Sequence, residues 1–193
     1  LPINEFIAEW GCINYKIEDI NNSKINLDWI LALCFPLISY SIRNFEKDSK
    51  PLIIGISALP GTGKSTLGRV LENIAKIRKF PIDVISIDDF YFPAEQLDQS
   101  MLGNPWDVPR GLPGSHSLDE MHHALDKYIN SGELIVPRFD KSLRNGCGDR
   151  SGSYSSTPKA LIIEGWFLGC TPLNRTSDEK SILNENISPK LSS

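Results

Sequence analysis

The sequence predicts an α/β fold of three layers (α/β/α), in which helices cover both faces of a mainly parallel sheet and a helical segment comes first. Three apolar runs, at residues 52–57, 82–87 and 160–163, have the length of strands. Their nearly continuous apolar character is typical of strands that are buried on both faces. Helical patterns lie between these runs, and the alternation of strand and helix favours parallel pairing.

Residues 1–50 are expected to form the N-terminal helical segment. A short helix is predicted near Ile3–Trp10 and a longer one from Leu27 to Phe45, with an Asn-rich polar stretch between them. The longest apolar stretch, Trp29–Ile38, has about half the length of a membrane span and contains Pro36. We therefore expect a core helix here rather than a membrane anchor.

The first apolar run leads into a loop that matches a phosphate-binding pattern. The loop follows G-x-x-x-x-G-K-[ST], except that alanine stands at the first glycine position. Glycine lets backbone N–H groups approach an anion closely, and the positive end of the next helix adds to the attraction. Lys64 is predicted to reach the outer phosphates of ATP, and Ser65 to offer its hydroxyl to Mg²⁺. The expected ATP-binding residues are Ala58, Leu59, Pro60, Gly61, Thr62, Gly63, Lys64, Ser65 and Thr66.

A glycine-rich turn between a strand and a helix can be ordinary, so the context of this loop matters. Apolar residues continue at helical spacing after it, at Leu67, Val70, Leu71, Ile74 and Ala75. Strand, loop and helix therefore occur in the order that a phosphate loop requires. The pattern predicts a P-loop NTPase fold.

Long segments rich in proline and glycine separate the remaining elements. Residues 91–117 are expected to form a long loop, which a helix follows. Ser117–Glu120 reads as a capping box that opens this helix, and Gly132 lies near its end. Pro137–Pro158 is predicted to be a second irregular segment before the third strand.

Composition excludes several classes of function. Twenty Lys and Arg against 24 Asp and Glu give a net charge of −4, so no general basic surface is available for nucleic acid. The four cysteines, at positions 12, 34, 147 and 170, have no metal-ligand spacing, as expected for reduced thiols in a cytoplasmic protein. We expect neither a nucleic-acid nor a membrane partner, and the sequence leaves the oligomeric state open.

Acidic residues follow the second and third strands, at the carboxyl-terminal edge of the sheet, where ligands bind in parallel α/β folds. Asp88 is predicted to be the catalytic base that orients an acceptor hydroxyl, with an ordinary pKa of about 4. Lys64 is expected to assist at the transferred phosphoryl group. Glu164 is predicted to act on Mg²⁺ through water beside Ser65, and Asp89 to share either duty. The alternative is that these acids cap the ends of strands or helices.

Six sequence blocks in this order form a specific combination: Gly55–Thr66, Ser86–Tyr91, Arg110–His116, Pro137–Ser142, Gly148–Arg150 and Glu164–Gly169. Together they resemble D-glycerate 3-kinase of the plant and cyanobacterial type, which belongs to a wider group with uridine kinase, phosphoribulokinase and pantothenate kinase. In that group the base is the aspartate of a D-x-F pattern that closes the second strand, which corresponds to Asp88. The resemblance implies phosphorylation of D-glycerate by ATP, giving 3-phosphoglycerate and ADP in photorespiratory salvage, in the plastid stroma if the source is a plant.

D-glycerate is a small anionic hydroxy acid, so its carboxylate needs a fixed cation, and the planar guanidinium of arginine suits it best. Basic side chains occur in both long loops, where the alternative for each is a solvated charge. His116 and Asp140 are expected to bind hydroxyls, and Tyr91 either lines the pocket or packs under the loops. The candidate substrate-binding residues are Tyr91, Arg110, His116, Arg138, Asp140, Lys141 and Arg150.

The resemblance also implies strands after the last block, and they are missing, because only polar sequence follows Pro172. We therefore expect residues 51–172 to form a partial P-loop kinase domain and residues 173–193 a flexible tail. The chain is then either a piece of a longer kinase or a degenerate relative. Three functions stay open: a D-glycerate kinase, a kinase for another small acceptor (nucleoside, pantothenate or sugar phosphate), and a nucleotide-binding module without catalysis.

Overall fold

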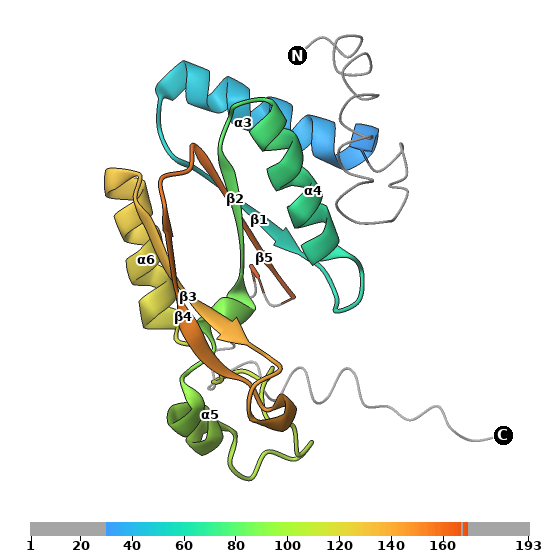
Figure 1. Cartoon of the computed structure of the whole chain (residues 1–193), viewed down its shortest axis with the longest axis vertical. Helices are drawn as coiled ribbons and strands as arrows, with labels where there is room; N and C mark the ends of the chain where they lie inside the picture. Colours follow the sequence, from blue (N-terminus) through green and yellow to red (C-terminus); the bar gives the residue numbers. More distant parts are fainter. Residues whose placement is uncertain (1–29, 167, 170–193) are drawn as a thin grey trace, which may run out of the picture.

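Three parallel strands form the central sheet (Figure 1). The computed structural model describes residues 30–166 and 168–169. The strands β1 (Leu52–Ser57), β5 (Ala160–Gly165) and β2 (Ile82–Ser86) lie in the order β1-β5-β2. All residues of β5 are buried, because it pairs in parallel with β1 on one side and with β2 on the other. The predicted parallel sheet is confirmed.

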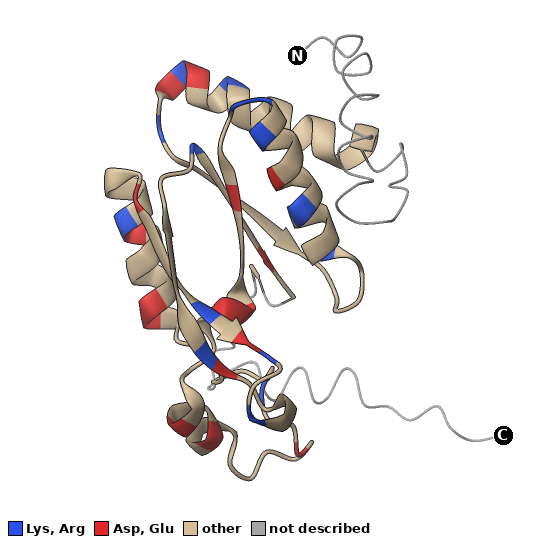
Figure 2. Cartoon of the chain, viewed as in Figure 1, with Lys and Arg blue, Asp and Glu red and all other residues tan. Residues whose placement is uncertain are grey.

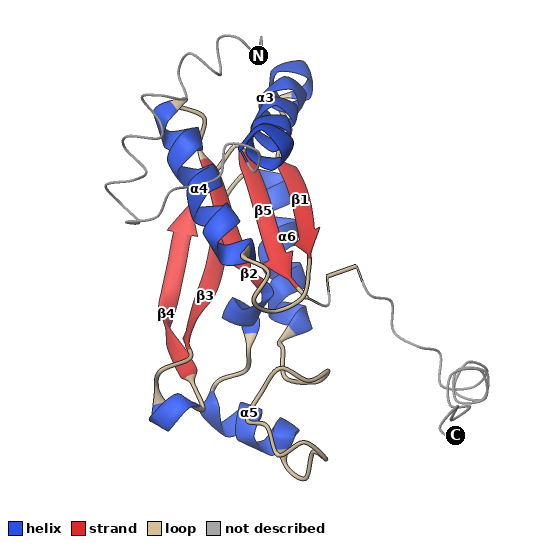
Figure 3. Ribbon diagram, turned by 90° about the vertical axis from the view of Figure 1, so that its right-hand side faces the viewer, coloured by secondary structure: helices blue, strands red, loops and turns tan. Residues whose placement is uncertain are grey.

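Helices cover one face of this sheet. The π-helix η1 (Ile30–Cys34) continues into α3 (Phe35–Asp48), and α4 (Lys64–Ile77) follows β1. Figure 3 shows α3 and α4 on the same side of the strands. Their apolar side chains pack with Ala160 and Ile162 of β5 in one buried cluster. The predicted helix after the phosphate loop is confirmed, and so is the longer N-terminal helix over the part that the structure describes.

Helix α6 (Leu118–Ser131) covers the opposite face. Because side chains alternate along a strand, Leu161 and Ile163 of β5 point away from α4 and join Tyr128 of α6 in a second buried cluster. The two clusters lie on either side of the sheet, so the predicted three-layer α/β/α architecture is confirmed.

An antiparallel hairpin forms where Pro137–Pro158 was expected to be irregular, so that expectation is wrong. Strands β3 (Leu134–Asp140) and β4 (Asp149–Ser156) pair with a register shift between Arg138 and Phe139. Strand β4 consists largely of serine and glycine and carries little strand propensity of its own. Its pairing therefore depends on tertiary contacts.

Asp83 of β2 supplies part of that tertiary support. The hydroxyl of Tyr154 donates a hydrogen bond of 3.0 Å to Asp83 Oδ2, and the hydroxyl of Ser156 donates to the same oxygen. These contacts attach β4 to the edge strand of the parallel sheet. On the other strand of the hairpin, Leu134 and Val136 are fully buried against α6.

The long segment after β2 contains two short helices, η2 (Ile87–Phe90) and α5 (Ala94–Met101). Asp149 of β4 accepts a 2.9 Å hydrogen bond from Ala94 N and so caps α5 from another element.

The N-terminal cap predicted for α6 is wrong in detail. Ser117 occupies the N-cap position, but its side chain accepts no hydrogen bond from the helix. Gly132 ends α6 with φ 75°, as predicted.

Some expectations lie outside the described residues. They are the short helix at Ile3–Trp10 and the tail at 173–193, and the domain boundaries therefore stay predictions. Within residues 30–166 and 168–169, none of the helices has the length and apolar content that a membrane span needs.

Gly68 marks a close approach of α4 to β2 and gives a test of this packing. A Cβ atom at Gly68 would lie 2.7 Å from Cγ1 of Val84. Because a β-branched side chain has little rotamer freedom, we expect Gly68→Ala to lower the free energy of unfolding by about 1–3 kcal/mol, despite the helix propensity of alanine. Urea denaturation measures the loss, and adding Val84→Ala is expected to recover part of it. A Gly68→Ala variant as stable as the wild type would contradict this packing.

Tyr128 gives a test at high pH. Its side chain is fully buried, and burial, with a contribution from Asp83, raises its pKa to about 12. The folded state therefore favours the neutral phenol, and this stabilisation is lost as the pH rises above about 10, where the unfolded chain ionises. Two pKa units correspond to about 2–3 kcal/mol. We expect the free energy of unfolding to fall more steeply from about pH 9 to 12 in the wild type than in Tyr128→Phe; equal slopes would argue against a buried phenol.

Candidate active site

The loop between β1 and α4 has the form of a phosphate-binding turn. Gly61 and Gly63 have φ values of 78° and 89°, which favour glycine. Helix α4 starts at Lys64, so its first N–H groups lie at the loop and can hold an anion. Lys64 Nζ and Thr62 Oγ1 each donate a 2.8 Å hydrogen bond to the carbonyl oxygen of Leu59. The lysine thus lies folded over the loop.

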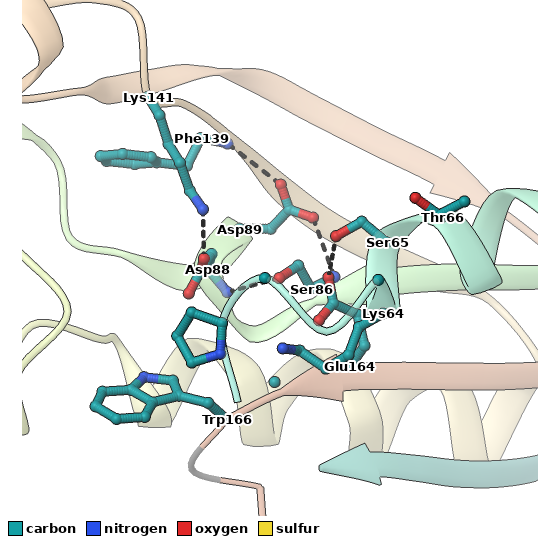
Figure 4. Close-up of a pocket in the computed structure, with 14 residues that line it drawn as sticks. Lys64, Ser65, Thr66, Ser86, Asp88, Asp89, Phe139, Lys141, Glu164 and Trp166 are labelled. Atoms are coloured by element: carbon teal, nitrogen blue, oxygen red, sulfur yellow. Dashed lines mark hydrogen bonds and ion pairs between the residues drawn. The ribbon is translucent and has the colours of Figure 1, made fainter. Parts of the chain in front are cut away.

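A pocket of about 530 Å³ opens at the carboxyl ends of the strands, beside this loop (Figure 4). The loop and α4 contribute one wall, and η2, β3 and the end of β5 contribute the others. The lining residues that the sequence predicted are Pro60, Gly61, Gly63, Lys64, Ser65, Thr66, Asp88, Asp89, Lys141 and Glu164. The lining residues not predicted as site residues are Ser86, Phe139, Gly165 and Trp166.

Asp88 lines the same pocket as the phosphate loop. Its Oδ2 accepts a 2.6 Å hydrogen bond from Lys141 Nζ, and its Oδ1 is 3.7 Å from His116 Nε2. Burial alone would raise the pKa of this carboxyl, but interactions with His116, Lys141 and Tyr91 outweigh it and hold the pKa well below its usual range. The expectation of an ordinary pKa is therefore wrong, and Asp88 is ionised at neutral pH.

Tyr91 and His116 stack behind Asp88. Their ring centroids are 4.2 Å apart, and the two residues form an isolated antiparallel bridge. Burial, followed by the charge of Asp88, raises the pKa of Tyr91, so its hydroxyl stays neutral. His116 Nε2 is buried and has no hydrogen-bond partner. Both residues were predicted to bind substrate, and the structure places them around Asp88 rather than in the wall of the pocket.

Asp89 connects η2 to the hairpin. Its carboxylate accepts hydrogen bonds from the Arg138 guanidinium at 3.0 Å, from Phe139 N at 3.4 Å and from Ser86 N at 3.4 Å. Arg138 also stacks on the Tyr154 ring, 4.6 Å from its centroid. The structure therefore pairs Asp89, which was predicted to be a metal ligand, with Arg138, which was predicted to bind the substrate.

The other predicted cations contact protein groups. Arg110 donates to the carbonyl oxygens of Gly146 and Cys147, at 2.6 and 2.9 Å. Arg150 forms a two-pronged ion pair with Glu120 and donates to the carbonyl oxygen of Tyr91. These contacts hold the hairpin against the segment that follows β2.

Asp140, predicted to bind a hydroxyl of the substrate, points at its own turn. Its carboxylate accepts hydrogen bonds from the backbone N–H and the hydroxyl of Ser142, at 2.8 and 2.6 Å. These bonds lower its pKa. Lys141 lies between them in sequence and faces the pocket instead. Among the described residues, Lys64 and Lys141 are the cations that line the pocket.

Alternation along β3 could have indicated which side chains face the pocket. Phe139 and Lys141 line it, and Arg138 and Asp140 do not, as expected where successive side chains point to opposite sides. Because the hairpin itself was not predicted, this signal was not used. Ser86 and Trp166 each lie two positions from a predicted site residue at a strand end, Asp88 and Glu164, and this proximity could have indicated them.

Ser65 and Glu164 fit a magnesium site that depends on bound phosphates. Ser65 Oγ donates a 2.9 Å hydrogen bond to Glu164 Oε1 at the start of α4. Among the described residues, no group of three or more His, Cys, Asp and Glu side chains could hold a metal ion. Mg²⁺ at nucleotide sites usually takes one or two protein ligands and completes its shell with phosphates and water. The pair is compatible with that arrangement, whereas Asp89 already accepts three hydrogen bonds.

Two variants separate a structural role of Asp89 from a Mg²⁺-binding role of Glu164. We expect Asp89→Ala to lower the free energy of unfolding by about 1–3 kcal/mol, because it leaves backbone N–H groups of two elements unpaired. Glu164→Gln is expected to change stability little and to weaken the dependence of nucleotide binding on Mg²⁺. Thermal unfolding and nucleotide titrations with and without Mg²⁺ measure both. If Asp89→Ala kept full stability and lost the Mg²⁺ dependence, the roles would be reversed.

Comparison with known proteins finds sequence similarity to kinases. The chain is 37% identical over 158 residues to the chloroplastic D-glycerate 3-kinase of Arabidopsis thaliana, covering 72% of this chain and 34% of that protein. It is 30% identical over 167 residues to a pantothenate kinase of Streptococcus thermophilus, covering 83% and 52%. No established family profile matches the chain.

A solved structure shows the same fold. The D-glycerate 3-kinase of Cryptococcus neoformans superposes with a TM-score of 0.64 at 24% identity, covering 79% of this chain and 58% of that one. The chain spans between 34% and 61% of the length of the first curated relatives that it matches. The predicted resemblance is confirmed: the chain is a relative of D-glycerate 3-kinase and related kinases, and its fold is that of the P-loop kinases.

Proposed function

We propose that this chain carries the phosphate-binding and acceptor-activating part of an ATP-dependent kinase that phosphorylates D-glycerate to 3-phosphoglycerate. The observation that supports the proposal is that Asp88, an ionised carboxylate, lines the same pocket as the phosphate loop. A base and a phosphate site in one pocket are what transfer to a hydroxyl requires.

The phosphate side uses the loop and α4. Backbone N–H groups at Gly61–Gly63 and Lys64 would hold the phosphates of ATP, and Lys64 would leave the Leu59 carbonyl to reach them. Ser65 and Glu164 would hold Mg²⁺, directly or through water. When bound, Mg²⁺ neutralises charge on the phosphate oxygens.

The acceptor side uses Asp88. Its low pKa makes it a weak base, but phosphoryl transfer passes through a loose transition state, in which the proton leaves the attacking hydroxyl late. Orientation of the hydroxyl therefore matters more than basicity. Tyr91 and His116 stack on each other with His116 Nε2 3.7 Å from Asp88 Oδ1, and we expect them to act as positioning residues for the carboxylate.

The pocket offers one cation that could bind an anionic acceptor. Lys64 belongs to the phosphate side. Among the pocket-lining residues that the structure describes, Lys141 is then the cation left for a substrate carboxylate. D-glycerate offers both a carboxylate and a hydroxyl within a few bonds. In a photosynthetic host this reaction would serve photorespiratory salvage in the plastid stroma, and elsewhere we propose a cytoplasmic enzyme.

The test is ADP release with ATP, Mg²⁺ and an acceptor panel of D-glycerate, L-glycerate, uridine, pantothenate and ribulose 5-phosphate. We expect turnover that depends on D-glycerate. Asp88→Asn should keep ATP binding and lower turnover by about 10²–10⁴-fold. Lys64→Ala should lose ATP binding, and Lys76→Ala, an exposed lysine at the far end of the same helix, serves as the matched control.

The other outcomes decide between the remaining functions. Turnover with pantothenate, uridine or ribulose 5-phosphate but not with D-glycerate would replace the acceptor and keep the mechanism. ATP binding without turnover of any acceptor would favour a nucleotide-binding module without catalysis. Full activity of Asp88→Asn would show that another group is the base.

A further inference from the structure

Lys141 and Asp88 form a close ion pair inside the pocket. Lys141 Nζ lies 2.6 Å from Asp88 Oδ2, and both side chains line the pocket wall (Figure 4). In the ribbon of Figure 2, basic positions on the hairpin lie near the acidic positions of η2. The oxygen that would accept a proton from the acceptor hydroxyl is therefore occupied by an ammonium group.

The backbone that carries Lys141 is held on both sides. Before it, Phe139 N donates to Asp89, and after it, the N–H and hydroxyl of Ser142 donate to Asp140. The Lys141 side chain itself is 55% exposed. A lysine has a flexible stem of four carbons, so its ammonium can leave Asp88 while its backbone stays in place.

The pair conflicts with the role of Asp88 as a base. In the reaction, a proton passes from the acceptor hydroxyl to the Asp88 carboxylate, the hydroxyl oxygen bonds to the γ-phosphorus of ATP, and the bond to the β–γ bridging oxygen breaks to release ADP. The Lys141 ammonium competes with that hydroxyl for Asp88 Oδ2 and makes the carboxylate a weaker base. An anion that takes the ammonium would remove this competition.

We propose that the carboxylate of the acceptor takes Lys141 from Asp88, so that binding of an anionic substrate frees the base. This inference rests on the proposed function and adds a gate to it. By the gate we mean that Asp88 becomes free to act as the base only when the acceptor carboxylate binds Lys141. Lys141 then both recognises the carboxylate and couples that recognition to the reaction. A neutral alcohol such as glycerol would find Asp88 still paired, so the enzyme would discriminate against it in turnover and not only in binding.

The gate makes an unusual prediction for binding. Removing the charge of Asp88 removes the competitor for Lys141, so Asp88→Asn should bind D-glycerate more tightly than the wild type, by about tenfold if one good ion pair is released. If Asp88 only contacted the substrate, the same variant would bind D-glycerate more weakly. Lys141→Met should weaken binding, and isothermal titration calorimetry measures all three proteins.

Turnover of glycerol gives a second, independent readout. In the wild type we expect acetate, which supplies a carboxylate without a hydroxyl, to stimulate phosphorylation of glycerol in a saturable way. In Lys141→Met, acetate should have no effect, and the preference for D-glycerate over glycerol in kcat/KM should fall by about tenfold, as expected when one charged contact to the substrate is lost. Lys127→Met is the matched control, because Lys127 also forms an ion pair, 3.1 Å from Glu133, outside the pocket.

The outcomes separate the gate from the proposed function. Turnover of D-glycerate, with weaker binding by Asp88→Asn and no stimulation by acetate, would overturn the gate and leave the kinase intact. An unchanged preference in Lys141→Met would also overturn it. Absence of both binding and turnover of D-glycerate in the wild type would overturn the proposed function, and the gate with it.

Discussion

The three hydrogen bonds of Asp89 hold the two sides of the pocket together. One carboxylate accepts from Ser86 N at the end of β2 and from Phe139 N and the Arg138 guanidinium of β3. This contact fixes the position of β3 relative to the end of β2, together with the Lys141–Asp88 ion pair and the packing of Phe139 on Tyr91. Because side chains alternate along a strand, a shift of one residue would turn Phe139 and Lys141 out of the pocket. The position of Lys141 beside Asp88 therefore depends on Asp89, whose side chain bonds to Ser86, Arg138 and Phe139 rather than to either of these two residues.

The charges of the site are mostly neutralised by nearby partners. Asp89 pairs with Arg138, Asp88 with Lys141, and Glu164 accepts from Ser65. A pocket that is to receive the phosphates of a nucleotide and an anionic acceptor must not present free carboxylates to them, since like charges at close range disfavour binding. Among the described residues that line the pocket, the cations that can attract these anions are Lys64 and, once it leaves Asp88, Lys141.

The sequence was most informative where local chemistry decides the structure. The phosphate loop needs glycine, lysine and a following helix at fixed spacing, so its residues could be assigned without any tertiary information. The acids at the strand ends could also be placed, because the carboxyl ends of parallel strands meet at one edge. The hairpin could not, because β4 is rich in serine and glycine and is held by Asp83 of another strand. With the hairpin unpredicted, the sides that Arg138, Asp140 and Lys141 face could not be assigned either.

Arginine and lysine have different tasks in this chain, and their chemistry explains why. Arg150 directs three nitrogen donors at protein oxygens, Arg110 donates to two carbonyl oxygens, and Arg138 donates to Asp89 while it stacks on Tyr154. Such multiple contacts suit a planar guanidinium, which loses little freedom per hydrogen bond. They build the rigid part of the acceptor side. The lysines in the pocket each make one contact, to Leu59 O or to Asp88, and one contact can be exchanged for another at small cost. Loop arginines were predicted to bind the substrate because a guanidinium suits a carboxylate, but the same property makes arginine the better residue for holding the protein's own loops. A cation that must release one anion to take another is better supplied by lysine.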